Sequence, residues 1–234
     1  MLEGIIVGNV SNTYTVEVND VIYECNARGK FKNIDMAPVV GDKVKIEVLD
    51  KDKKIAIISD ISKRNNYIKR PKLANLSKLI LVISAKQPKP DLIMLDKQLA
   101  FAEFLNIDVL IVINKIDLEK EEKIAEIKKI YHDIGYKVIV TNAKTGEGVK
   151  QLNKELLNNI SAFSGNSGVG KSSLLNSIFN DSLTQEGEIS NKNKKGKNTT
   201  TAIKLYKIDK NTYIADTPGF ATFDIYEIET RWII

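Results

Sequence analysis

The sequence contains few of the residues that cross-link a chain or hold a metal. Cys25 is its single cysteine and His132 its single histidine among 234 residues. One cysteine excludes a disulfide within the chain, and one cysteine with one histidine cannot form an ordinary structural zinc site. We therefore interpret both residues as structural, with Cys25 in a strand behind Tyr23 and His132 on a charged helix face.

Long apolar runs are also missing. No uninterrupted apolar stretch approaches the length of a membrane span. The N-terminus, Met1-Leu2-Glu3-Gly4, lacks the basic-then-apolar layout of a secretion signal. We expect a cytoplasmic protein without membrane contact. A hydrophobic content of 43% is enough for the core of one large domain or two modest ones.

The net charge of +5 is unevenly placed. Two stretches, 61–90 and 189–208, contain basic residues and no acidic ones. The first holds Lys63, Arg64, Lys69, Arg70, Lys72, Lys78, Lys86 and Lys89, and the second holds Lys192, Lys194, Lys195, Lys197, Lys204 and Lys207. Such stretches suit phosphate backbones, although a solvated linker and a lysine-rich loop explain either one equally well.

The first 68 residues predict a small all-β domain. Apolar residues alternate over 4–10, 13–18, 21–27, 43–48 and 54–61, and turn-forming residues separate these runs. Five short strands in a segment of this size favour a closed barrel of the OB-fold type, which often binds nucleic acid. The segment has ten basic and ten acidic residues, so any such face is local, as around Arg28 and Phe31. A barrel that serves only as a spacer is the alternative.

From Lys78 onward the pattern becomes that of an α/β domain. Continuous apolar runs at 79–83, 109–113 and 138–140 are typical of parallel strands that are buried on both faces. Helical spacing at 91–105, with Asp91 as N-cap, at 119–134 and at 149–160 predicts helices between them. Ligands of such sheets bind at the carboxyl ends of the strands.

The strongest motif is Gly165-Asn166-Ser167-Gly168-Val169-Gly170-Lys171-Ser172, which fits the phosphate-binding pattern G-x-x-x-x-G-K-S. A short apolar run, 160–163, precedes it, and a helical segment, 171–179, follows it. Glycines let backbone N–H groups point at phosphates, to which the helix N-terminus adds positive charge. We expect Lys171 to neutralise the outer phosphates and Ser172 to ligate Mg²⁺, with Ser173 completing the loop. A glycine-rich helix cap is the competing interpretation.

Two further segments at strand ends indicate guanine. Asn114-Lys115-Ile116-Asp117 follows the run 109–113. The Asp117 carboxylate would accept hydrogen bonds from N1–H and the 2-amino group of guanine, a donor pair that adenine lacks. Asn114 would brace the loop and Lys115 would cover the base. Asn142-Ala143-Lys144 ends the next strand and would reach the same base through backbone N–H groups. An Asn/Asp turn after a strand explains either segment alone.

Two segments after the phosphate loop carry residues that suit the terminal phosphate and its metal. Thr199-Thr200-Thr201 offers a hydroxyl to Mg²⁺, and either Thr199 or Thr200 fits that role. Asp216-Thr217-Pro218-Gly219 follows a strand at 213–215, where Asp216 would hold Mg²⁺ through water and the Gly219 N–H would sense the terminal phosphate. Lys171, Thr200 and Gly219 are thus the candidate catalytic residues. The alternative for the first segment is a threonine-rich entry into the next strand, without a role in metal binding.

The order of these motifs is circularly permuted, because the guanine-reading segments precede the phosphate loop. With this order, the chain resembles the circularly permuted, ribosome small-subunit-dependent GTPases of bacteria. The resemblance covers nearly the whole chain and rests on Pro38-Val39-Val40-Gly41-Asp42, Arg70-Pro71, Ala74-Asn75 and Ser164 to Leu174. It implies an OB-fold domain at 1–68 that contacts ribosomal RNA, and a permuted GTPase domain at 69–234.

The resemblance also implies an activity. Members of that family hydrolyse GTP late in small-subunit assembly, when the subunit stimulates them. GTP or GDP with Mg²⁺, the small subunit and its rRNA are then the expected ligands and partners of a monomer. Phe220 stands where many other GTPases carry a water-orienting glutamine, so intrinsic turnover should be slow.

The sequence departs from the family pattern at three places. Asn198 stands where the family usually has histidine, and Asn142 where it usually has serine. The family's C-terminal zinc domain has no counterpart before Ile234, so zinc is not expected, and we expect weak binding to the ribosomal subunit. Two alternatives remain open. A P-loop ATPase or kinase would leave Asp117 unexplained, and a nucleotide-regulated RNA-binding scaffold would have negligible turnover.

Overall fold

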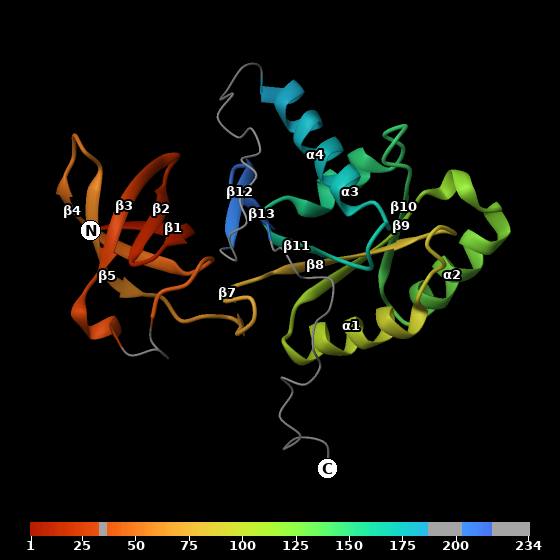
Figure 1. Ribbon diagram of the computed structural model, residues 1–234, viewed down its shortest axis with the longest axis horizontal. Coiled ribbons are helices and arrows are strands. Elements are labelled where there is room, and N and C mark those ends of the chain that lie inside the picture. The colour runs from red at the N-terminus through yellow and green to blue at the C-terminus, as the bar shows by residue number, and fades with distance from the viewer. Residues whose placement is uncertain (33–36, 187–202, 217–234) are drawn as a thin grey trace, which may run out of the picture. The chain divides into compact units, whose positions relative to one another are not determined.

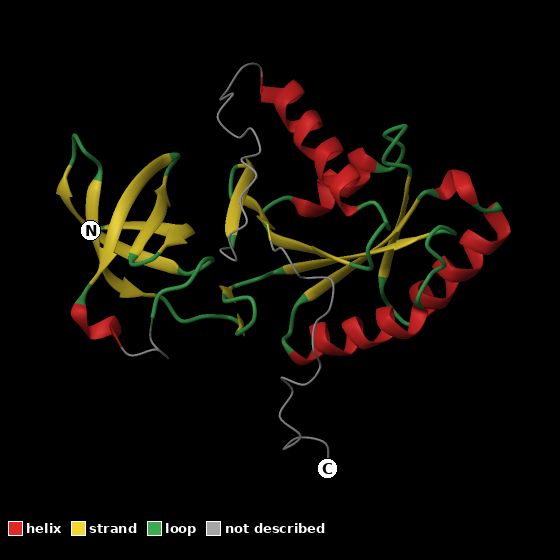
Figure 2. Ribbon diagram, in the orientation of Figure 1, coloured by secondary structure: helices red, strands yellow, loops and turns green. Residues whose placement is uncertain are grey.

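The computed structural model describes residues 1–32, 37–186 and 203–216, and these form two compact units (Figures 1 and 2). The first unit contains Met1–Ser77, Asn158–Ile160 and a hairpin of two strands, β12 (Lys204–Asp209) and β13 (Thr212–Asp216). The second contains Lys78–Leu157 and the chain from Ser161 through the last described helix. The expected domain boundary after residue 68 stays a prediction.

The first unit is built on the predicted five-stranded barrel. Its strands are β1 (Leu2–Val10), β2 (Thr13–Val18), β3 (Val21–Ala27), β4 (Lys43–Asp50) and β5 (Ile55–Ile61). They pair in the order β1-β2-β3-β5-β4, and β4 pairs with β1 to close the barrel. Only β3 and β5 run parallel. Closure leaves the barrel with few exposed strand edges, which is the physical advantage of this architecture.

Side-chain alternation places the barrel core as the sequence predicts. In β4, Val44 and Ile46 are buried while Lys43 is exposed. Ile6, Val16 and Ile58 reach the same core from other strands and have no exposed surface. Because side chains of a strand point alternately to its two faces, this burial fixes the register of each strand.

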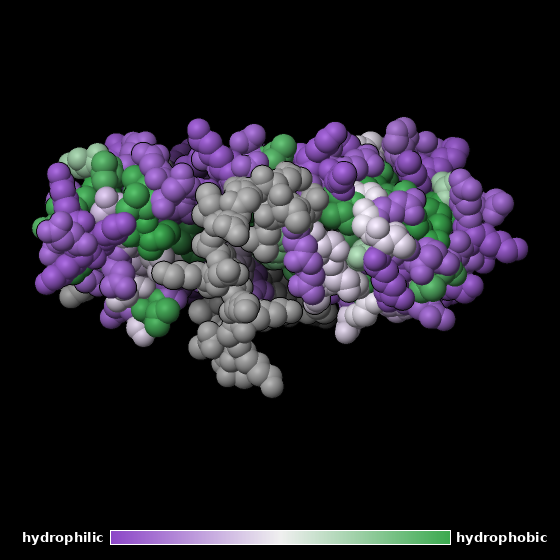
Figure 3. All heavy atoms as spheres, turned by 90° about the horizontal axis from the view of Figure 1, so that it is seen from above, coloured by the Kyte–Doolittle hydropathy of each residue, from purple (hydrophilic) through white to green (hydrophobic). Residues whose placement is uncertain are grey.

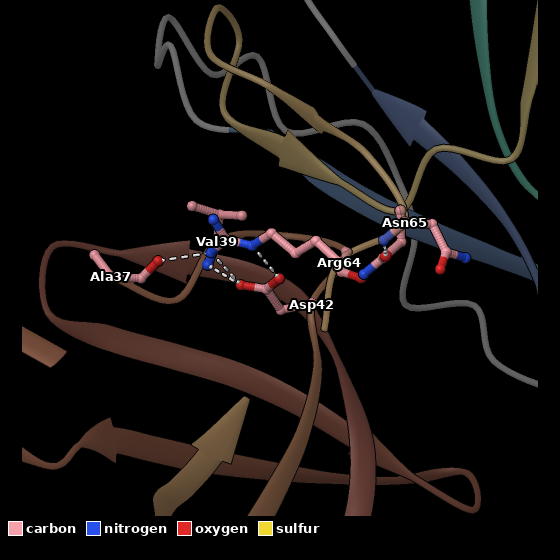
Figure 4. Close-up of polar contacts among 7 residues, drawn as sticks. Ala37, Val39, Asp42, Arg64 and Asn65 are labelled. Carbon is pink, nitrogen blue, oxygen red and sulfur yellow. Dashed lines mark hydrogen bonds and ion pairs between the residues drawn. The ribbon is translucent and has the colours of Figure 1, made fainter. Parts of the chain in front are cut away.

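A buried ion pair fastens the chain after the barrel onto the barrel itself (Figure 4). Asp42 is fully buried, and its two carboxylate oxygens accept hydrogen bonds from Arg64 at 2.7 and 2.8 Å. Arg64 also donates to the Ala37 carbonyl at 2.8 Å, and the Val39 N–H donates to Asp42 at 2.8 Å. The pairing explains why Asp42 is tolerated in the interior, since both of its oxygens are satisfied.

A short hairpin, β6 (Tyr67–Ile68) and β7 (Leu73–Ala74), completes this arrangement. Asn75 follows it, accepts a hydrogen bond from the Asn65 N–H and donates to the Gly41 carbonyl, both at 2.9 Å. At Gly41, φ is +88° and an added Cβ would lie 2.1 Å from the Ala74 carbonyl oxygen. Glycine is therefore required there. Two short motifs of the sequence, 38–42 and 74–75, thus meet in one contact.

The β12–β13 hairpin is attached to the barrel by a second polar cluster. Lys204 of β12 pairs with Gly8 of β1. The Lys207 ammonium donates to Glu17 at 2.5 Å and also contacts Asp20. Glu17 is 8% exposed and accepts a further hydrogen bond from the Tyr213 hydroxyl at 3.1 Å. Two residues of the hairpin therefore donate to Oε1 of this buried carboxylate.

The second unit alternates strands and helices as predicted. In chain order its elements are β8 (Lys78–Ser84), α1 (Leu92–Phe104), β9 (Asp108–Asn114), α2 (Glu121–Asp133), β10 (Lys137–Thr141), α3 (Val149–Leu156), β11 (Ile160–Ser164) and α4 (Lys171–Glu186). The strands pair in the order β10-β9-β8-β11, and all three pairings are parallel. Helices α1 and α2 cover one face of this sheet and α3 and α4 the other (Figure 1).

Two details differ from the sequence prediction. Helix α3 ends at Leu156 rather than near 160, because Asn158 has φ of +59° and Ile160 already belongs to β11. Helix α4 continues to Glu186, whereas the predicted helical segment ends at 179. The other boundaries agree within a few residues, and Asp91 caps α1 by accepting a hydrogen bond from the Met94 N–H.

The surface of the second unit is polar where its sequence is charged. Figure 3 shows mainly hydrophilic residues at the end that carries α2. Among the described residues, no helix is long and apolar enough to span a bilayer.

Candidate functional site

The candidate site lies where the four parallel strands of the second unit end. Chain order reverses between β8 and β11, because β9 and β10 lie on one side of β8 and β11 on the other. Sheets of this kind bind ligands at such a reversal, outside the carboxyl ends of the strands. The loops after β9, β10 and β11 carry the three motifs that the sequence singled out, so the topology brings them to one edge.

The loop after β11 has the conformation that its glycines permit. Gly165, Gly168 and Gly170 have φ of +140°, +80° and +101°, which side chains rarely adopt. An added Cβ would lie 2.1 Å from the Val82 carbonyl oxygen at Gly165 and 2.2 Å from Asn114 Nδ2 at Gly170. Both contacts are too short for any substituent, so the loop is pressed against β8 on one side and the end of β9 on the other.

Lys171 begins α4 and folds back over this loop. Its ammonium donates to the carbonyls of Gly165 at 2.5 Å and Asn166 at 3.0 Å. Burial lowers the pKa of Lys171 from its ordinary value. The charge is thus held within the ring of the loop, where it is partly desolvated and available to an anion.

Asn114 joins three loops through one amide. Its Nδ2 donates to the Val169 carbonyl at 2.9 Å, in the phosphate loop. Its Oδ1 accepts hydrogen bonds from the Thr141 hydroxyl at 3.1 Å and from the Ala143 N–H at 3.2 Å, after β10. Asn114 is 1% exposed, and loss of its side chain would leave several buried groups without partners.

Lys115 spans two loops in the same way. It has φ of +62°, and its ammonium donates to the carbonyls of Gln87 and Gly168, each at 2.6 Å. Gln87 follows β8 and also accepts a hydrogen bond from the Ser84 hydroxyl at 2.8 Å. The loop after β8 is therefore part of the site, which the motifs did not predict because its contacts use a backbone carbonyl.

Asp117 lies in a short 3₁₀ helix, Ile116–Leu118, and is exposed. The Asn142–Lys144 turn follows β10. There the Asn142 carboxamide oxygen accepts a hydrogen bond from the Lys144 N–H at 3.0 Å, and the Asn142 carbonyl accepts one from the Gly146 N–H at 2.9 Å. The backbone of this turn is thus fixed by Asn142 itself, so asparagine fills a turn-forming role at this position.

The other predicted residues belong to β13, to the first turn of α4 or to segments outside the described residues. Asp216 ends β13 and is exposed; together with burial, its hydrogen bond raises the pKa of Tyr206. Asp216 belongs to the first unit. Asn198, Thr199, Thr200, Gly219 and Phe220 lie outside the described residues. Ser172 and Ser173 are exposed in the first turn of α4.

Gln98 is a buried polar residue beside the loop that sequence reasoning missed. Its Nε2 donates to the Ser164 hydroxyl at 2.9 Å, directly before Gly165. Nothing in the pattern of α1 distinguishes this glutamine from one on a solvated face, so only the packing identifies it.

Comparison with known proteins agrees with this geometry. The RsgA GTPase family model matches residues 61–226, and the model of the RsgA N-terminal domain matches residues 3–58. The chain belongs to the RsgA GTPase family. Among curated relatives, the small ribosomal subunit biogenesis GTPase RsgA of Alkaliphilus metalliredigens is 42% identical over 225 residues, which cover 96% of this chain and 77% of that protein. The protein of the same name from Ruminiclostridium cellulolyticum is 39% identical, over 96% of this chain and 74% of its own length.

Two solved structures show the same fold. YjeQ from Thermotoga maritima superposes with a TM-score of 0.78 at 35% identity, over 94% of this chain and 75% of that one. YloQ, described as a circularly permuted GTPase, gives a TM-score of 0.77 at 28% identity, over 98% of this chain and 75% of that one. The barrel followed by a permuted GTPase domain is therefore confirmed.

Proposed function

We propose that this chain binds guanine nucleotides and hydrolyses GTP in the biogenesis of the small ribosomal subunit. The observation that carries the proposal is the hydrogen bond from Asn114 to the Val169 carbonyl, because it ties the guanine-reading segment to the phosphate loop. A single ligand with a base and a phosphate chain then fits both segments. The two curated relatives are named small ribosomal subunit biogenesis GTPases.

The phosphate end of the ligand is assigned to residues 165–173. The positive φ of Gly165, Gly168 and Gly170 supports a loop whose N–H groups face an anion, as does its position before α4. Lys171 would exchange its carbonyl partners for the outer phosphate oxygens. Charge neutralisation there would serve the developing charge of the transition state as well as binding.

The base is assigned to the segments after β9 and β10. Asp117 would accept hydrogen bonds from N1–H and the 2-amino group of guanine, and the Lys115 side chain would lie along the base. Asn142, Ala143 and Lys144 would donate backbone N–H groups to its carbonyl. These N–H groups now donate to Glu147, Asn114 and Asn142, so any that contacts the base would exchange its present acceptor. The rigid link between these segments through Asn114 supports this assignment, because a pre-formed site loses little freedom on binding.

Mg²⁺ fits the oxygen donors that the sequence offers. Ser172 supplies a hydroxyl and Asp216 a carboxylate, both exposed, and hard oxygen ligands of this kind suit Mg²⁺. Thr199 or Thr200 would add a further hydroxyl, and Gly219 would sense the terminal phosphate. The bound ion would neutralise phosphate charge.

The partners are assigned to the small ribosomal subunit and its rRNA, with a cytoplasmic monomer that has no membrane contact. The barrel, residues 1–68, would contact RNA, and residues 69–234 would form the GTPase domain. The basic stretch 61–90 supports this only in part. Arg64 forms an ion pair with Asp42. The ammonium of Lys78 lies 3.9 Å from the carboxylate of Glu155, and that of Lys86 lies 3.9 Å from the carboxylate of Glu119. The turn of the β6–β7 hairpin keeps Lys69, Arg70 and Lys72 exposed, and we place the RNA contact there.

The first experiment titrates labelled GDP, GTP and ATP into the chain, its Asp117→Asn variant and an Asp108→Asn control. Asp108 is exposed at the opposite end of β9, so this control makes the same chemical change away from the site. We expect guanine preference in the wild type and control, and its loss in Asp117→Asn. Equal affinity for GTP and ATP in the wild type would refute the proposal.

Single-turnover hydrolysis separates an enzyme from a scaffold. We expect slow GTP hydrolysis by the chain alone and faster hydrolysis with purified small ribosomal subunits. Tight GTP binding without hydrolysis under either condition would favour the nucleotide-regulated RNA-binding scaffold instead.

A further inference from the structure

Gln98 is an amide enclosed in an otherwise apolar helix face. The buried residues of α1 besides Gln98 are Leu95, Leu99, Phe101 and Ala102. Gln98 is 3% exposed, and an amide in such surroundings costs stability unless it is hydrogen-bonded. A methionine would fill similar space without that cost, so the amide calls for a specific reason.

Its partner is the residue on which the phosphate loop begins. The Ser164 hydroxyl accepts a hydrogen bond from Gln98 Nε2 at 2.9 Å, and neither side chain is open to solvent. Ser164 is the last residue of β11 and pairs with Leu81 of β8. The next residue, Gly165, departs from the strand with φ of +140°. The bond therefore holds the point at which the chain leaves the sheet.

Gln98 also faces the loop itself. Together with Gly165, Asn166 and Val169 it lines a small hollow between α1 and the loop. The later half of the loop is held differently, because Asn114 binds Val169 and Lys115 binds Gly168. The start of the loop is held by the close approach of Gly165 to Val82, by the Lys171 ammonium on the Gly165 and Asn166 carbonyls, and by the Gln98–Ser164 pair. Only the last of these contacts comes from α1.

We propose that Gln98 is a positioning residue for the phosphate loop, which fixes the start of the loop from α1 without touching the nucleotide. This rests on the proposed function, since it concerns the same nucleotide site. A loop anchored at both ends keeps its N–H groups aimed at the phosphates before the ligand arrives. Loss of the amide would loosen the start of the loop, weakening phosphate binding while leaving the choice of base unchanged.

The test uses three variants: Gln98→Met, Ser164→Ala and the double variant. Each single change breaks the Gln98–Ser164 hydrogen bond and leaves one member of the pair buried, whereas the double change removes both. Thermal stability should therefore fall in each single variant and recover in the double variant. GDP affinity should fall roughly three- to tenfold in Gln98→Met and stay low in the double variant, because the anchor remains absent. GTP should remain preferred over ATP in all of them.

The control is Leu99→Val, a buried change on the same helix that makes no polar contact with the loop. It should lower the melting temperature without altering GDP affinity. Recovery of GDP affinity along with stability in the double variant would overturn the proposal, since Gln98 would then serve only to satisfy Ser164. Unchanged GDP affinity in Gln98→Met and in the double variant would also overturn it. Absence of guanine preference in the wild type would instead refute the proposed function.

Discussion

Cys25 lies in β3 with 1% of its surface exposed, and burial raises the pKa of its thiol to about 11. Since the thiolate is the reactive form, the folded protein should react very slowly with Ellman's reagent at pH 8. Denaturant should release one rapidly reacting thiol per chain. Equal rates in the folded and unfolded protein would contradict this burial.

Gly170 allows a second prediction at the scale of single residues. Gly170→Ala would bring a Cβ to 2.2 Å from Asn114 Nδ2 and break the contact of that amide with Val169. We expect at least a tenfold loss of GDP affinity, because this closure joins the base and phosphate segments. Gly135→Ala is the matched control, since φ is +97° there and no atom lies within 4 Å of an added Cβ. It should cost stability but not GDP affinity.

Residues of the site differ in how far sequence predicts them. The loop glycines and Asn114 belong to spaced motifs, and their conformations and contacts follow from the chemistry of those motifs. Gln98 and the Gln87 carbonyl do not, because their roles depend on which helix and which loop the sheet brings alongside. Sequence spacing contains no information about a contact between residues 98 and 164.

The Asp42–Arg64 pair tests how the barrel is joined to the elements that follow it. Arg64→Met would leave a fully buried carboxylate without its counter-ion, so unfolding free energy should fall by about 3–5 kcal/mol. Lys63→Met changes the exposed neighbour and should have an effect of less than about 0.5 kcal/mol. Urea unfolding followed by circular dichroism measures both. Equal losses would show that the pair contributes nothing specific.

At the scale of elements the sequence is most informative where burial repeats regularly. Alternation predicts the five barrel strands, and continuous apolar runs predict β8, β9 and β10, because each pattern matches one or two buried faces. The hairpin β6–β7 has two-residue strands, which are too short to show any period. Its position depends on Asn75 and Gly41 instead. The basic stretch around this hairpin is not entirely available to a partner, because Arg64 forms an ion pair with the buried Asp42.

At the scale of the whole molecule, Lys207 links two distant parts of the chain. Burial alone would lower its pKa, but hydrogen bonds to Asp20 and Glu17 outweigh burial and raise the pKa above its ordinary value of 10.5. A raised pKa gives stability that is fully present below about 10.5 and is lost as pH rises toward the folded-state value. Wild type should therefore lose more unfolding free energy above pH 10.5 than Lys207→Met. Denaturant titrations at pH 9 and 11 measure this difference, and parallel losses would contradict it.

The link between Glu17 and Lys207 also affects the order in which the protein is completed during synthesis. These residues lie 190 positions apart. The strand that pairs with Gly8, β12, is synthesised equally late. At about 5–20 residues per second, a ribosome needs roughly 10 to 40 seconds to reach the second residue after making the first. From residue 61 onward the five barrel strands have been made, yet for the rest of that interval the Glu17 carboxylate has neither of its hairpin partners. All four parallel strands of the second unit are made in the same interval, so its sheet is complete before the Glu17 cluster of the first unit can form.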